Sequence, residues 1–160
     1  MSRRKKAEYI RDIGVDSRFQ SLVIQKLINV LMERGKKELS RSIVYGAFDV
    51  INQKTHGDDK KSFEVFNKAF SQVVPYVEVR PRRVGGSVYQ VPMEVNEKRR
   101  RSLALRWLID AAQQRPGKNM IQRLSSEIMD AAEGHGGAVK KRSGVQKMAE
   151  ANRAFSHYAW

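Results

Sequence analysis

The chain has 160 residues, which is enough for one compact domain with a real hydrophobic core and too few for two ordinary ones. It carries 31 Lys and Arg against 17 Asp and Glu, a formal net charge of +14, so nucleic acid or an anionic membrane surface leads the candidate partners. The absence of cysteine excludes disulfides, cysteine-ligated zinc, iron–sulfur clusters and thiol nucleophiles, and no apolar run approaches the ~20 residues that a membrane-spanning helix needs.

Residues 1–15 are predicted to form a flexible basic arm. Its clustered cations are Arg3, Arg4, Lys5 and Lys6. Such a segment repels itself, stays mobile and becomes ordered on a polyanion. The alternative is a tail that only keeps the protein soluble. The segment lacks a hydrophobic stretch, so we expect no secretory signal in it.

Residues 16–160 are expected to form a single helical domain. Apolar residues recur at helical spacing in six stretches, each of which predicts a helix with one buried face. Leu39 is expected on the apolar face of the second helix and Met148 on that of the last, while Gly144 favours a late start or a kink in the last. The six predicted helices cover about residues 16–35, 36–56, 59–74, 96–115, 120–133 and 138–155.

The helical period is interrupted at residues 76–95, YVEVRPRRVGGSVYQVPMEV, which are rich in Val and Tyr. Gly85-Gly86 is predicted to make the tight turn of a β-hairpin. Pro81 and Pro92 cannot donate ladder hydrogen bonds, so this ribbon cannot be the middle of a sheet. The predicted fold class is therefore mainly α, a six-helix bundle-like domain with one projecting β-hairpin arm.

Basic residues cluster at four further places, which we interpret as contacts to the phosphates of a nucleic acid. They are Lys36 and Lys37; Arg80, Arg82 and Arg83; Arg99, Arg100 and Arg101; and Lys140, Lys141 and Arg142. The last two clusters are expected at helix N-termini, where the macrodipole disfavours cations and a bound phosphate would remove the conflict. On the hairpin, arginine can bind a phosphate through two N–H groups at once, and tyrosine can stack on bases. The alternatives are a solvated charged face and an edge hairpin whose charges only prevent aggregation.

Catalytic patterns are weak. The three histidines, His56, His135 and His157, are far apart and none has metal-ligand spacing. The glycines match neither a phosphate loop nor a dinucleotide fingerprint. We therefore expect no enzyme activity, no cofactor, no metal and no small-molecule substrate.

Three stretches resemble the bacterial-type small-subunit ribosomal protein seven family. They are MERGKKELSRSIVYGA at 32–47, EVRPRRVGGSVYQVP at 78–92 and AVKKRSGVQKMAEANRAFSHYAW at 138–160. The likeness covers nearly the whole chain and keeps order and spacing. It implies a helical domain with a projecting hairpin. It also implies a primary binding protein of small-subunit ribosomal RNA that nucleates assembly of the head (the 3′ major domain) and borders exit-site transfer RNA near the decoding region.

The resemblance also implies partners and places for particular residues. The partners would be small-subunit ribosomal RNA, exit-site transfer RNA and messenger RNA, and small-subunit proteins nine and eleven, with no membrane. The basic clusters would face RNA. Gly85, Gly86 and Tyr89 would lie on the arm near transfer RNA, and the tail residues Phe155, Tyr158 and Trp160 would approach protein eleven. The location would be cytoplasmic, in the small ribosomal subunit, or the equivalent organellar ribosome.

Other interpretations of the same residues stay open at this point. A DNA-binding architectural protein would share the charge and the arm, an RNA-modifying enzyme would need a cofactor site, and a membrane-surface protein would need a basic helix with a free apolar face. The aromatic tail residues either fold back onto the core or form a patch for a protein or RNA partner.

Overall fold

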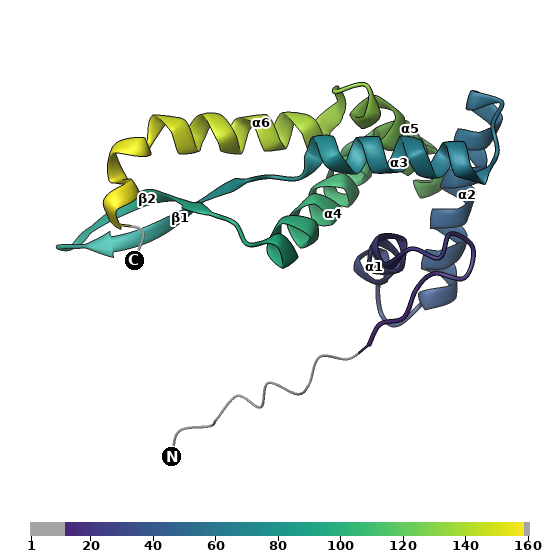
Figure 1. The fold of residues 1–160 in the computed structure, drawn as a ribbon, viewed down its shortest axis with the longest axis horizontal. Helices are drawn as coiled ribbons and strands as arrows, with labels where there is room; N and C mark the ends of the chain where they lie inside the picture. Colours follow the sequence, from purple (N-terminus) through teal and green to yellow (C-terminus); the bar gives the residue numbers. More distant parts are fainter. Residues whose placement is uncertain (1–11, 159–160) are drawn as a thin grey trace, which may run out of the picture.

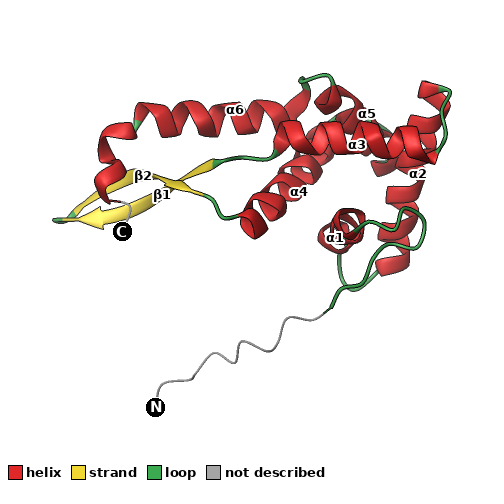
Figure 2. Cartoon of the chain, in the orientation of Figure 1, coloured by secondary structure: helices red, strands yellow, loops and turns green. Residues whose placement is uncertain are grey.

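A computed structural model of the chain describes residues 12–158, and its fold class is the one predicted (Figures 1 and 2). The helical body lies at one end of an elongated molecule, and an antiparallel hairpin projects from it with α6 alongside. In chain order the elements are α1 (Leu22–Leu31), α2 (Lys37–Thr55), α3 (Asp59–Val73), β1 (Val77–Val84), β2 (Ser87–Glu94), α4 (Glu97–Gln114), α5 (Met120–Ala132), α6 (Gly136–Ala151) and the 3-10 helix η1 (Arg153–Tyr158).

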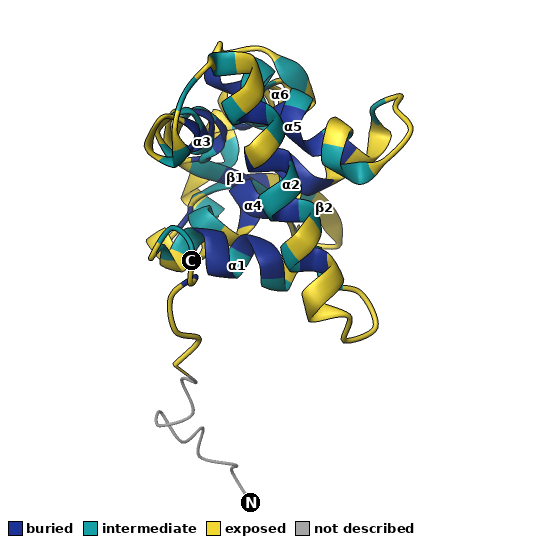
Figure 3. Ribbon diagram, turned by 90° about the vertical axis from the view of Figure 1, so that its right-hand side faces the viewer, coloured by how far each residue is buried: buried dark blue, intermediate teal, exposed yellow. Residues whose placement is uncertain are grey.

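The hydrophobic core lies inside the helical body, where α5 packs against α2, α3 and α4 (Figure 3). Leu124 and Ile128 of α5 are fully buried, and they belong to one apolar cluster with Phe48 of α2 and Phe66 of α3. The two phenylalanine rings lie 5.6 Å apart, centroid to centroid. Each such side chain stabilises the fold by about 1.5–3 kcal/mol through burial, so this cluster is the rigid base from which the arm projects.

The first helix begins later than the periodicity predicts. The carboxylate of buried Asp16 accepts hydrogen bonds from the backbone N–H groups of Arg18 and Phe19, at 3.1 and 3.0 Å, and so holds this segment in a turn. Gln20 follows with a φ of +50°, which no helix allows. Phe19 nevertheless packs on Phe48, with ring centroids 4.5 Å apart. The spacing therefore identified a core residue correctly but assigned it the wrong backbone conformation.

Two further expectations are wrong, because the predicted apolar faces are not the faces that pack at these positions. Leu39 is 56% exposed in the first turn of α2, and Met148 is 50% exposed on α6, whose buried residues are Ala138 and Ala149. The last helix also differs at both ends, since it begins at Gly136, continues through Gly144, and gives way to η1 after Ala151.

The hairpin forms as predicted. Its strands pair from Val77 opposite Glu94 to Val84 opposite Ser87. Gly85 and Gly86 have φ angles of +56° and +88°, the two positive values that a type I′ turn requires. The arm is not bare, however, because α6 lies along β1 and η1 packs on β2.

Candidate nucleic-acid interface

Five of the predicted site residues lie outside the described residues. They are Arg3, Arg4, Lys5 and Lys6 of the N-terminal arm and Trp160 of the tail. The other predicted sites fall on the α1–α2 loop, the hairpin, the start of α4, the second turn of α6, and η1.

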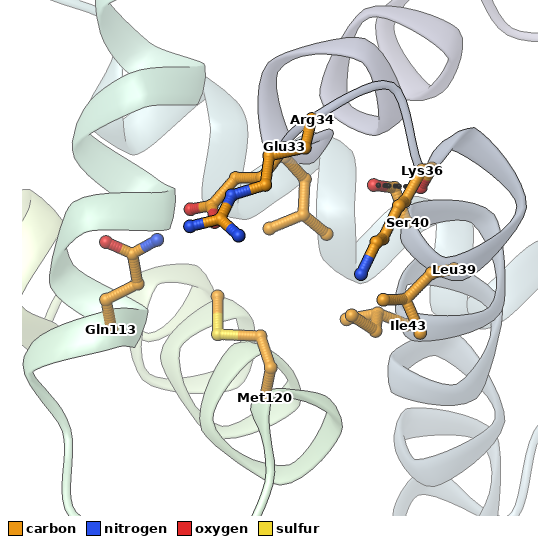
Figure 4. Close-up of a pocket in the computed structure, with 9 residues that line it drawn as sticks. Glu33, Arg34, Lys36, Leu39, Ser40, Ile43, Gln113 and Met120 are labelled. Atoms are coloured by element: carbon orange, nitrogen blue, oxygen red, sulfur yellow. Dashed lines mark hydrogen bonds between the residues drawn. The ribbon is translucent and has the colours of Figure 1, made fainter.

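Lys36 and Lys37 are exposed where the α1–α2 loop enters α2. The loop turns sharply because Arg34 and Gly35 have φ angles of +51° and +76°. Beside it opens a pocket of about 390 Å³ whose apolar lining includes exposed Leu39. Figure 4 shows Arg34 and Lys36 reaching toward this pocket from the loop, which gives it an apolar floor and a partly basic rim.

A buried carboxylate organises the base of the hairpin. Glu78 accepts hydrogen bonds from the Nε atom of Arg80 at 2.5 Å, and from the Nε atom of Arg99 at 2.9 and 2.8 Å. One carboxylate cannot neutralise two guanidinium groups, and each arginine has five N–H donors, so both keep capacity for an anion. The strand register places Arg82 opposite Tyr89 and leaves Arg83 exposed on the other face of the ribbon.

The cluster at the start of α4 is placed as predicted, but the protein itself supplies acceptors for it. The Asn96 side chain caps the helix by accepting from the Arg99 N–H at 3.3 Å. Arg100 donates from Nε to the Val95 carbonyl at 2.6 Å, and Arg101 pairs with Glu97. Local acceptors therefore reduce the conflict with the macrodipole that the sequence suggested, and a phosphate is not needed to hold this helix start.

The cluster on α6 is not at the helix N-terminus, which corrects the prediction. Because the helix begins at Gly136, the basic run occupies its second turn. Arg142 donates from Nη1 to the Gln72 carbonyl at 2.7 Å, and so ties α6 to the last turn of α3. Lys140 and Lys141 are exposed. The run thus divides into one arginine that braces the fold and two lysines that face solvent.

The N-terminus of α6 is satisfied instead by Glu127, which sequence reasoning did not identify as a site. This carboxylate is fully buried, accepts from the Ala138 N–H at 2.8 Å, and pairs with Arg115, which also pairs with Asp130. Burial alone would lower the pKa of Arg115, but hydrogen bonds to the two carboxylates outweigh it and raise that pKa. A signal existed, because Glu127 lies three residues after Leu124 on the apolar stripe of its helix.

The aromatic tail folds back, although onto the hairpin and not onto the core of the body. The Tyr89 ring lies 5.0 Å from that of Phe155 and 5.6 Å from that of Tyr158, centroid to centroid. All three side chains remain half-buried. The tail and the predicted transfer-RNA face of the arm therefore form one continuous aromatic surface.

Other kinds of site find little support in the described range. Among residues 12–158 there is no group of three or more His, Asp or Glu side chains that could hold a metal. None of the helices there has the length and apolarity needed to cross a membrane.

Comparison with known proteins finds relatives that match this chain over all or nearly all of its length. The small ribosomal subunit protein uS7 of Agrobacterium fabrum is 54% identical over 160 residues, all of both chains, and that of Bartonella henselae is 54% identical over the same span. The protein of the same name from a Thermoanaerobacter species is 53% identical over 150 residues, 94% of each chain. Residues 2–153 match the family described as Ribosomal protein S7p/S5e. On this match, and on the six α-helices and one hairpin arm that residues 12–158 form, the chain belongs to the Ribosomal protein S7p/S5e family.

Proposed function

We propose that this chain is a structural, non-catalytic constituent of the small ribosomal subunit and acts in the cytoplasm within that particle. Family membership and the shared name of its relatives support this role. We further propose that residues 16–160 bind small-subunit ribosomal RNA as one domain, that the basic arm 1–15 adds to this contact, and that binding nucleates assembly of the subunit head.

The observation that carries the RNA-binding proposal is a set of exposed cations that no carboxylate neutralises. Within residues 12–158, the members of this set form no ion pair with the protein; they are Lys36, Lys37, Arg83, Lys140 and Lys141. Like charges on one small protein destabilise it through self-repulsion, so a fold under selection for stability alone gains nothing from them. A polyanion that spans the α1–α2 loop, the hairpin and α6 would be bound by all three.

The hairpin arm supports a more specific proposal about neighbouring molecules. A thin hairpin braced by α6 and η1 holds its turn, Gly85-Gly86, at the far end of the molecule from the core. We propose that this arm borders exit-site transfer RNA, and messenger RNA, near the decoding region. The tail residues Phe155 and Tyr158, which pack on Tyr89 of the arm, would lie near small-subunit protein eleven, with protein nine a further neighbour.

A salt titration of RNA binding tests this proposal. The full chain is titrated against a transcript of the 3′ major domain of Agrobacterium fabrum small-subunit ribosomal RNA, with duplex DNA as competitor. If about 6–10 phosphates are neutralised, affinity should fall by about 10³–10⁵ between roughly 50 and 200 mM salt. Replacing Lys140 and Lys141 by Gln should lower the salt slope by about two, whereas Lys60→Gln, an exposed lysine outside the clusters, should leave it unchanged.

The proposal would be refuted by an almost flat titration. Equal competition by duplex DNA would favour the architectural DNA-binding alternative.

A further inference from the structure

We propose that Tyr76 is a stacking platform for one unpaired base of the bound RNA, with Arg100 fixing the ring and contacting the phosphate of the same nucleotide. This inference rests on the proposed RNA binding and adds to it a particular residue and a particular kind of contact. It applies to the junction between the helical body and the arm, where β1 begins.

The exposure of Tyr76 is the first observation. The residue is 67% exposed, more than any other exposed large apolar residue in the described range. A tyrosine in this position contributes little to the core, because the hydrophobic effect rewards only surface removed from water. Its flat ring is available to a partner, and aromatic rings are the side chains on which unpaired bases stack.

The second observation is that this exposed ring is already held in place. The Tyr76 carbonyl accepts from the Val95 N–H at 3.0 Å, and Arg100 donates from Nε to the Val95 carbonyl at 2.6 Å. The Arg100 guanidinium carbon then lies 4.9 Å from the centre of the Tyr76 ring. One face of the ring is therefore covered by a cation that is itself anchored, so little side-chain freedom is lost when a base binds the other face.

The third observation separates Tyr76 from the other tyrosine of the hairpin. Tyr89 is half-buried against Phe155 and Tyr158, so its ring is already used for packing. The sequence places both tyrosines on the same ribbon among arginines, and only the structure shows that one packs internally while the other is open.

Charge completes the site. Arg100 uses its Nε atom in the bond to Val95, so the terminal N–H groups of the guanidinium remain to donate to a phosphate. Arg99, the preceding residue, is exposed, and it has further N–H donors besides the one that it gives to Glu78. An unpaired nucleotide can stack its base on the Tyr76 ring and place its phosphate against the Arg100 guanidinium at the same time. Because every base has a π-face, the site should tolerate any base.

The test separates stacking from charge by combining affinity with its salt dependence. Tyr76→Phe keeps the ring, Tyr76→Leu removes it, and Arg100→Gln removes the cation. Binding of each full-length variant to the 3′ major domain transcript is measured at several salt concentrations, with circular dichroism and melting curves to verify the fold. Ultraviolet crosslinking of the wild-type complex, followed by mass spectrometry, maps nucleotide adducts to residues.

Tyr76→Leu should weaken binding about fivefold or more with an unchanged salt slope, and Tyr76→Phe should stay within about twofold of wild type. Arg100→Gln should lower the slope by about one. An adduct should map to Tyr76. If Tyr76→Leu binds as wild type, the stacking proposal is wrong, and the proposed RNA binding still stands as long as the lysine variants lower the slope. If the wild-type chain does not bind the transcript, the proposed function itself fails.

Discussion

The buried carboxylate of Glu127 should be the most costly single side chain to remove from the base of α6. Glu127→Ala takes the acceptor away from the Ala138 N–H and leaves Arg115 with Asp130 alone. Breaking a buried pair by removing one partner costs about 3–5 kcal/mol. Arg115 is 25% exposed and keeps its second carboxylate, so we expect the low end, about 3 kcal/mol.

For a chain of this length, about 3 kcal/mol lowers the melting temperature by roughly 6–12 °C. Thermal and urea denaturation of the full chain measure it, and hydrogen exchange should show that the first turn of α6 loses protection before the rest of the body. Glu127→Gln keeps the shape and an acceptor for Ala138, so it should cost less than Glu127→Ala. The matched control is Asp130→Asn, because Asp130 is 45% exposed and its pair with Arg115 is worth about 0–1 kcal/mol. If Glu127→Ala destabilises no more than this control, Glu127 does not support α6 in the way described.

Two further predictions concern the body and the arm. The hydrogen bonds from Arg18 lower the pKa of the Asp59 carboxyl below its ordinary value of 3.8, so the stability it adds is complete above that value and is lost as the pH falls through the lower pKa of the folded state. Asp59→Asn should therefore lower the melting temperature at pH 7, and this loss should shrink as the pH is lowered below 3.8; a loss that does not change with pH would contradict this. Tyr89→Leu should remove about 0.5–1.5 kcal/mol for each of its two ring pairs and speed proteolysis within η1. Tyr89→Phe should do neither, and an equally protected tail in both variants would show that the rings do not hold it.

The parts of the fold that could be predicted from the sequence are those that local chemistry determines. Gly85-Gly86 is tolerated with two positive φ angles wherever it occurs, and Asn96 caps the helix that follows it, so the hairpin and the start of α4 needed no knowledge of tertiary contacts. The true start of α1 was missed because Asp16 competes for backbone donors, which apolar spacing does not register.

The candidate site was predicted less completely, because a run of cations does not show which of its members the fold itself uses. Arg142 and its acceptor Gln72 are 70 residues apart in the sequence, and Arg99 reaches Glu78 across 21 residues. Neither pairing follows from spacing within one helix. Lys140 is exposed whereas Arg142 donates to the Gln72 carbonyl, and which member of the run meets an acceptor is decided by tertiary packing.

The return of η1 onto β2 has a consequence for how the chain is made. Synthesis proceeds from the N-terminus, so the hairpin strands are made well before residues 153–158, which contribute the rings that pack on Tyr89. An isolated two-stranded ribbon is only marginally stable in water. The helical body can therefore form around α5 before the arm is fully braced, and that bracing is complete only after α6 and η1 have been made and have packed on β1 and β2.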